Sequence, residues 1–149
     1  MTTFDYIIVG AGSAGCVLAD KLSANGRHSV LLIEAGPSDR RFWVQTPIGY
    51  GATYTDPKVN WRFYSEAEAG LGNRKMYVPR GKVLGGSSSI NALVYHRGQS
   101  SDYDDWKRAG NVGWDYNSIL PFFECFENVV GSDQQSQNIS GKLTITDVA

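Results

Sequence analysis

The chain of 149 residues carries 14 basic and 15 acidic side chains, which gives a formal net charge of −1 at pH 7. This length suffices for one domain with a sizeable core. The balanced charge argues against nucleic acid or an anionic membrane surface as a partner, and the apolar runs are far too short for a membrane span. Two cysteines, Cys16 and Cys125, do not make a disulfide framework, so the expected location is cytoplasmic.

Residues 5–34 predict a β-α-β unit. Residues 6–9 form a short apolar run that is typical of a parallel strand buried on both faces. Residues 14–25 carry an apolar stripe at helical spacing, and residues 30–33 form a second apolar run. A crossover of this kind is right-handed and makes the two strands parallel. The first strand begins so early that we expect no secretory signal.

A glycine-rich turn joins the first strand to the helix. Gly10 permits a tight turn, Gly12 lets the backbone approach a pyrophosphate, and Gly15 lets the helix pack close to the strand. The free N–H groups and the positive dipole end of the helix then face the phosphates. Glu34 ends the second strand about 20 residues beyond the last glycine, where an acid accepts hydrogen bonds from ribose hydroxyls.

The alternative to a dinucleotide site is a bare structural turn. The agreement of strand, turn, helix and acid favours the dinucleotide. Glu34 would repel a 2′-phosphate, which disfavours NADP and leaves NAD or FAD. Cys16 falls in the first turn of the helix, where a thiol can become reactive. A small packing residue is the favoured interpretation of this cysteine.

Residues 36–80 show no clean period and hold four prolines with many glycines and aromatic residues. A compact domain rarely tolerates so long an irregular stretch unless it is functional. We therefore expect an irregular segment with short helices that wraps a ligand or another part of the protein. Within it, residues 60–64 are a candidate strand and residues 74–78 its candidate partner.

Residues 80–98 form a second glycine-rich segment, with a glycine pair followed by three serines and an asparagine. Small residues let a flat ligand or a pyrophosphate approach the backbone, and successive N–H groups in such a loop form an anion nest. The hydroxyls would add donors, and Arg80 or Lys82 would add charge. A flexible linker is the alternative, but dense flanking apolar residues argue against it.

Residues 101–128 are predicted to be mainly helical. Ser101 and Asp104 loosely fit a capping box for a first helix. Asp115 or Asn117 caps a second helix that runs to about residue 128. If Asn117 is the cap, the proline at position 121 falls in the first turn, where proline is best tolerated.

The C-terminal part of the chain changes character after this helix. Residues 131–141 are polar and turn-like. Residues 142–146 alternate apolar and polar side chains, which predicts a final strand.

The two glycine-rich segments resemble those of the glucose–methanol–choline (GMC) oxidoreductases, flavoenzymes that oxidise alcohols. Residues 10–19 are close to the N-terminal fingerprint of that family. Residues 81–91 match the family's first signature, which continues at Tyr95, Gly98 and Asp104. Residues 103–123 extend the likeness to choline-dehydrogenase-like members, so that the resemblance covers nearly the whole chain.

The resemblance implies an α/β fold in which residues 5–34 begin a Rossmann-like FAD-binding domain, incomplete relative to the full family fold. It also implies hydride transfer from the CH–OH group of an alcohol substrate to FAD. Some members tether the flavin through a histidine; Ile90 stands there, so we expect noncovalent FAD. The implied cofactor-binding residues are Gly10, Gly12, Ser13, Ala14, Gly15, Glu34, Ala35, Val83, Gly86, Ser87, Asn91, Ala92, Leu93 and Val94.

No catalytic residue and no metal site is assigned from the sequence. The family's catalytic histidine lies near the C-terminus of a longer chain, and neither His28 nor His96 matches its position. We therefore expect an N-terminal fragment that is inactive alone and leaves apolar faces and strand edges uncovered. A complementary C-terminal chain is one candidate partner. Rival interpretations are a nucleotide-binding module without turnover and an NAD-dependent dehydrogenase domain; the second glycine-rich segment argues against the latter.

Overall fold

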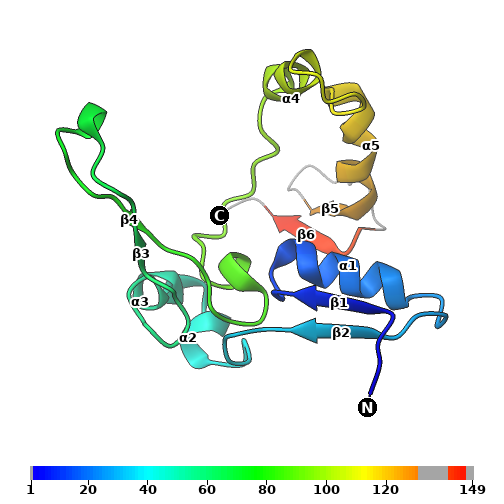
Figure 1. Cartoon of the computed structure of the whole chain (residues 1–149), viewed down its shortest axis with the longest axis horizontal. Coiled ribbons are helices and arrows are strands. Elements are labelled where there is room, and N and C mark those ends of the chain that lie inside the picture. The colour runs from blue at the N-terminus through cyan, green and yellow to red at the C-terminus, as the bar shows by residue number, and fades with distance from the viewer. Residues whose placement is uncertain (1, 131–140, 147–149) are drawn as a thin grey trace. The chain divides into compact units, whose positions relative to one another are not determined.

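The structure is a computed structural model that describes residues 2–130 and 141–146 (Figure 1). The chain divides into two compact units, Met1–Val94 and Tyr95–Ala149.

The first unit opens with the predicted β-α-β arrangement. Strand β1 (Tyr6–Val9), helix α1 (Ser13–Ser23) and strand β2 (Val30–Ile33) follow one another. The two strands pair in parallel, in a register that sets each β1 residue against the β2 residue 24 positions later, from Tyr6 opposite Val30 onward. Helix α1 packs along one face of this strand pair (Figure 1).

The prediction that the first strand is buried on both faces is wrong for this structure. Ile7 is 61% exposed and Val9 is 83% exposed, and in α1 Val17 and Leu18 are each more than half exposed. A parallel strand with an apolar sequence needs cover on both faces, but one helix on a two-stranded sheet covers only part of the apolar surface. The uncovered apolar faces that the sequence predicted are therefore present.

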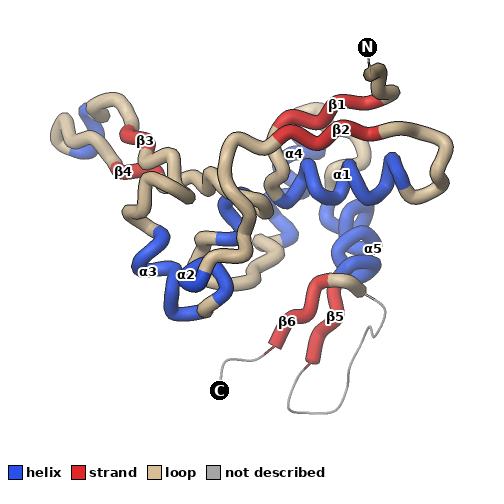
Figure 2. Tube along the Cα trace, turned by 90° about the horizontal axis from the view of Figure 1, so that it is seen from below, coloured by secondary structure: helices blue, strands red, loops and turns tan. Residues whose placement is uncertain are grey.

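Residues 36–80 contain only short elements, as expected (Figure 2). Helices of three or four residues alternate with turns, and two short strands pair antiparallel as a hairpin inside the predicted ranges. The elements are α2 (Phe42–Gln45), η1 (Pro47–Gly49), α3 (Tyr50–Thr53), β3 (Phe63–Tyr64), η2 (Ala69–Leu71) and β4 (Tyr77–Val78).

A small core joins this irregular segment to the second glycine-rich segment. Val59, Val83 and Ile90 are buried against one another, with Val44 packed beside them. Val83 and Ile90 flank the 3-10 helix η3 (Gly86–Ser89). The glycine and serine core of this segment is therefore anchored on both sides of η3 by apolar contacts, which argues against a solvated linker there.

Over residues 95–130 and 141–146, the second unit contains two helices and a strand pair. The elements are α4 (Ser100–Arg108), α5 (Tyr116–Phe126), β5 (Glu127–Val130) and β6 (Leu143–Thr146). The strands β5 and β6 pair in parallel, with Glu127 opposite Leu143. The second helix ends at Phe126, two residues before the predicted end near residue 128, because the backbone becomes extended at Glu127 and enters the sheet.

The helix caps differ in part from the predicted ones. The predicted capping pair Ser101 and Asp104 is wrong: Gln99 is the N-cap of α4, and its N–H donates to Asp102 Oδ2 over 2.9 Å. Of the two candidate caps for α5, Asp115 is the one observed. The proline at position 121 consequently lies inside the helix rather than in its first turn.

Two further expectations concern the remaining residues. Positions 131–140, predicted to be turn-like, lie outside the described residues. The predicted final strand is observed as β6. Within the described parts of the chain, no helix combines the length and the apolar character that a bilayer crossing requires.

Candidate dinucleotide-binding site

The first glycine-rich turn has the geometry that its glycines predict. Gly10 has φ +96°, a left-handed conformation that favours glycine, and its N–H donates to Ile33 O over 2.7 Å. A Cβ placed on Gly15 would overlap the carbonyl oxygen of Gly10. These two glycines therefore allow strand β1 to turn sharply into a helix that lies close against it.

Gly12 plays a different part, because nothing crowds it. A Cβ built there would find its nearest atom, the Cα of Gly86, 4.0 Å away. Gly12 is the N-cap of α1 without a side-chain cap, and the N–H of Cys16 donates to its carbonyl over 2.9 Å. This is the first hydrogen bond of the helix, so the N–H groups of Ser13, Ala14 and Gly15 before it have no acceptor within the helix. These N–H groups and the helix dipole are therefore available for an anion.

Glu34 holds the glycine turn from the end of β2. Its Oε2 accepts a hydrogen bond from the N–H of Ala11 over 2.8 Å, and its Oε1 accepts one from the N–H of Gly36 over 2.9 Å. Ala11 is fully buried, whereas Ala35 is exposed beside the acid. Each carboxylate oxygen has a further lone pair, so Glu34 can still accept from a ligand hydroxyl.

The structure brings the second glycine-rich segment against the first. The N–H of Gly85 donates to Ala11 O over 2.7 Å. A Cβ on Gly86, whose φ is +61°, would come within 2.8 Å of the Cα of Gly12. The N–H of Leu84 donates to Pro37 O over 3.0 Å. Two segments about seventy residues apart in sequence thus form one continuous backbone surface.

The serines of this loop hold the loop itself. The Ser88 hydroxyl donates to Gly85 O over 2.6 Å and the Ser89 hydroxyl to Leu84 O over 2.8 Å. The Ser87 hydroxyl oxygen accepts from the N–H of Gly81 over 3.0 Å. The prediction that all three hydroxyls add donors for a ligand is therefore wrong for Ser88 and Ser89, whose hydrogens point to backbone carbonyls.

The two candidate cations of the loop also have protein partners. The Lys82 ammonium lies 4.7 Å from the centre of the Trp61 ring, a cation–π distance. Arg80 donates from Nη1 to the carbonyl of Pro79 over 3.3 Å. Val83, which the sequence assigned to the same site, is fully buried in the core.

The four residues after the loop core form an exposed run. Asn91, Ala92, Leu93 and Val94 are exposed, Val94 to 81%. Leu93 has φ +60°, and its N–H donates to Asn91 Oδ1 over 2.9 Å. The predicted flavin-lining run therefore offers backbone and side chains to a ligand, with one residue in a conformation that leucine rarely adopts.

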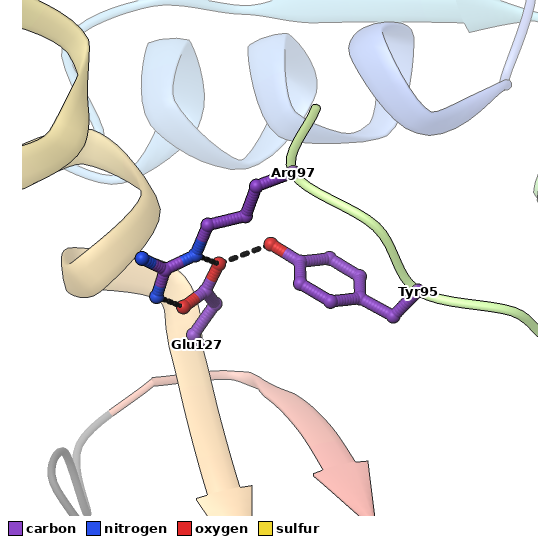
Figure 3. A network of polar contacts seen from close by, with 3 residues as sticks. All are labelled: Tyr95, Arg97 and Glu127. Carbon is purple, nitrogen blue, oxygen red and sulfur yellow. Dashed lines mark hydrogen bonds and ion pairs between the residues drawn. The ribbon is translucent and has the colours of Figure 1, made fainter. Parts of the chain in front are cut away.

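A polar network that the sequence did not predict lies in the second unit (Figure 3). Glu127, only 1% exposed, forms a bidentate ion pair with Arg97, and Tyr95 donates its hydroxyl to the same carboxylate. The Arg97 guanidinium holds the pKa of Glu127 below its usual range. Burial, followed by the hydrogen bond to Glu127, raises the pKa of Tyr95 to about 12. No sequence motif links residues 97 and 127.

The remaining candidates for chemistry have structural roles. The Nδ1 of His96 accepts from the N–H of Gly98 over 2.9 Å, and His28 meets Tyr6 edge-on in the turn before β2. The Cys16 thiol donates to Ala11 O over 3.3 Å, in keeping with a packing residue. Among the described residues, no group of three or more His, Cys, Asp or Glu side chains could hold a metal ion.

A parallel β-α-β unit with a glycine turn, an open helix N-terminus and a terminal acid defines a dinucleotide-binding fold. Comparison with known proteins is more specific. Residues 4–148 match the sequence profile of the GMC oxidoreductases. The chain therefore belongs to the GMC oxidoreductase family.

Individual relatives support this assignment. An oxygen-dependent choline dehydrogenase of Photobacterium profundum is 54% identical over 142 residues, which are 95% of this chain and 25% of that protein. The pyridoxine 4-oxidase of Mesorbium loti is 35% identical, with a TM-score of 0.81 over 93% of this chain and 27% of that one. An FAD-dependent oxidoreductase of Chaetomium thermophilum is 34% identical, with a TM-score of 0.79 over 97% of this chain and 26% of that one. The chain spans about a quarter of the length of these relatives.

Proposed function

We propose that this chain is the FAD-binding part of an oxidoreductase that acts on the CH–OH group of an alcohol. The observation that carries the proposal is the contact between Gly12 and Gly86, which joins two glycine-rich segments into one open backbone surface beside the N-terminus of α1. Family membership and the similarity to an FAD-dependent oxidoreductase support the same cofactor.

The residues fit a dinucleotide at this place. The first-turn N–H groups of Ser13, Ala14 and Gly15 would bind the pyrophosphate, and the lone pairs left on Glu34 would accept from the adenosine ribose, with Ala35 beside it. A side chain at Gly12 would fill the space into which the phosphates would come. The loop residues Gly86 and Ser87, with residues 91–94, would lie along the flavin and its ribityl chain, whereas Val83, assigned to this site from the sequence, is fully buried in the core and would support the loop from behind.

When bound, FAD supplies the hydride acceptor for oxidation of the carbinol carbon. The chain's own residues hold and orient that group. We assign no catalytic base to the chain, because the ring of His96 already accepts from Gly98 and does not match the family's catalytic position. We expect the chain with added FAD not to turn over alcohols, and a complementary C-terminal chain remains a candidate partner.

The mode of attachment is a further part of the proposal. Ile90 is 7% exposed, lies in the core, and has a side chain that forms no flavin bond. We therefore propose that FAD is held without a covalent tether. We also propose that the protein is cytoplasmic. Acid precipitation should release the yellow colour into the supernatant; colour that stays in the pellet would contradict noncovalent binding.

The experiment that tests the proposed function is extraction and identification of the cofactor from the purified protein. We expect flavin absorption in the visible range and FAD in the extract. Recovery of NAD, or of no nucleotide together with no uptake of added FAD, would overturn the proposal.

A further inference from the structure

We propose that Gly36 is a positioning residue: because it has no side chain, the backbone of Lys82 and Val83 lies directly against it, and this contact fixes the flavin half of the proposed site relative to the adenosine half. The inference rests on the proposed function, because it assigns the residue a role toward the proposed cofactor. Gly36 itself is not among the residues that would bind the cofactor.

The first observation is the lack of space around Gly36. A Cβ built there would overlap the carbonyl group of Lys82 and the backbone nitrogen of Val83. The φ of Gly36 lies outside the left-handed region, so its backbone conformation does not demand glycine. The close approach of the backbone at residues 82 and 83 is therefore what excludes a side chain at this position.

The second observation is what lies on each side of this contact. Gly36 comes two residues after Glu34, and its N–H donates to Glu34 Oε1 over 2.9 Å. Residues 82 and 83 lead into η3, and the N–H of Leu84 donates to Pro37 O over 3.0 Å directly beside the contact. The contact thus joins the acid that would bind the adenosine ribose to the loop that would lie along the flavin.

A second crowded glycine in the same unit provides a comparison. A Cβ on Gly49 would overlap the carbonyl oxygen of Trp43, and its φ of −67° is open to any residue. That contact joins η1 to α2, and neither element carries a residue that would bind the cofactor. Gly36 and Gly49 therefore share a steric constraint and differ in what the constraint holds in place.

Val59 offers a second route to the same two loop residues. It is fully buried, packs in the core with Val83, and its carbonyl accepts from the N–H of Lys82 over 2.7 Å. V59A removes two methyl groups from that core and introduces no overlap. Because Val59 would not bind the cofactor, this variant changes the support of the loop without changing a ligand contact.

The test compares the affinity of the cofactor-free protein for FAD with its affinity for ADP, which lacks the flavin. Calorimetry measures both affinities in the unaltered protein and in G36A, V59A and the matched control G49A. Far-ultraviolet circular dichroism shows whether each variant is folded. The absorption bands of bound FAD report the surroundings of the flavin ring, which a purely structural effect on the fold would not change.

We expect G36A to raise the dissociation constant of FAD at least about tenfold and to leave that of ADP within about threefold, because the added methyl group meets residues 82 and 83 and none of the residues that would bind ADP. V59A should lower the preference for FAD over ADP by about two- to fivefold, since its core loosens under the loop. G49A should keep the preference of the unaltered protein. The bands of bound FAD should move toward those of free FAD in G36A and stay in place in G49A.

Three results would overturn the inference. One is a preference for FAD over ADP that G36A leaves unchanged. Another is an equal loss of FAD and ADP affinity in G36A, which would mean that Gly36 supports the site as a whole. The third is a preference lowered as much in G49A as in G36A, which would mean that any such overlap has this effect.

Two further outcomes are decided by the other proteins in the set. If G36A does not fold, V59A decides: a lowered preference for FAD supports the inference, and an unchanged one overturns it. Failure of the unaltered protein to bind FAD more tightly than ADP would instead overturn the proposed function, and the inference with it.

Discussion

At Gly12 the missing side chain leaves open space, whereas at Gly15 it makes room for the carbonyl of Gly10. The two glycines stand three positions apart in one motif, yet one faces the proposed ligand and the other faces the protein. A substitution at Gly12 should therefore affect cofactor binding, whereas a substitution at Gly15 should affect the stability of the fold.

Gly12→Ala should fold normally and lose FAD. Gly12 has φ −78°, which alanine adopts freely, and the added Cβ would meet no atom closer than 4.0 Å. The same methyl group would occupy the approach of a pyrophosphate, so we expect the FAD dissociation constant to rise about 10- to 100-fold. Gly51→Ala is the control, since its Cβ also meets nothing within 4 Å. Equal FAD affinity in the two variants, measured by fluorescence titration, would argue against a phosphate site at Gly12.

Glu34 carries a second prediction at the same scale. Glu34→Ala removes the acceptor of the Ala11 and Gly36 N–H groups together with the proposed ribose contact. We expect FAD binding to weaken by about 1.5–3 kcal/mol, the range for hydrogen bonds to a charged group. Glu66→Ala, at an acid whose side chain is 96% exposed, should leave FAD binding unchanged. Titration calorimetry that finds the two variants alike would remove Glu34 from the site.

At the scale of elements, the contact of α1 with β1 depends on Gly15. A Cβ there would overlap the Gly10 carbonyl, so the helix would have to move away from the strand. We expect Gly15→Ala to destabilise the protein by about 1–3 kcal/mol, as overpacking does, with Gly51→Ala as the control. Urea denaturation of the protein with FAD removed measures this effect. A variant as stable as the control would show that the helix has freedom to shift.

The ion pair that joins residue 97 to the start of β5 predicts a pH-dependent stability. Because Arg97 lowers the pKa of folded Glu127, the pair stabilises fully above the ordinary carboxyl pKa, and that stabilisation is lost as pH falls through the lowered one. Glu127→Gln should cost about 3 kcal/mol at pH 7, since it leaves a partly buried guanidinium uncompensated.

The gap between Glu127→Gln and the unaltered protein should narrow as the unfolding midpoint is measured at successively lower pH. Glu66→Gln, which alters an exposed ion pair with Lys75, should cost less than about 1 kcal/mol at any pH. A gap for Glu127→Gln that stays constant down to acid pH would mean that the charge of Glu127 does not contribute.

At the scale of the whole molecule, what the sequence predicts well is local. The strand, turn and helix of residues 5–34 form through short-range patterns, and the hairpin of β3 and β4 lies within its predicted ranges. The extent of burial was not predictable in the same way, because the cover that an apolar strand such as β1 needs comes from outside its own sequence.

Prediction from the sequence was wrong where contacts between residues far apart in the chain determine the structure. Glu127 directly follows the apolar helical pattern that ends at Phe126, but it forms an ion pair with Arg97, 30 residues away, and pairs with β6 as the first residue of a strand. The bonds from Ser88 and Ser89 to loop carbonyls were likewise invisible, since hydroxyls followed by an asparagine look like ligand donors. The contact of Gly12 with Gly86 was not predicted from the sequence; the family resemblance implied only that both segments bind FAD.

We propose above that the two glycine-rich segments together form one FAD site. The most direct test is to titrate the cofactor-free protein with FAD and, separately, with NAD, and to measure both affinities by calorimetry. We predict that FAD binds at least about tenfold more tightly than NAD, because an NAD site would not require the second glycine-rich segment. Tighter binding of NAD than of FAD would contradict the account.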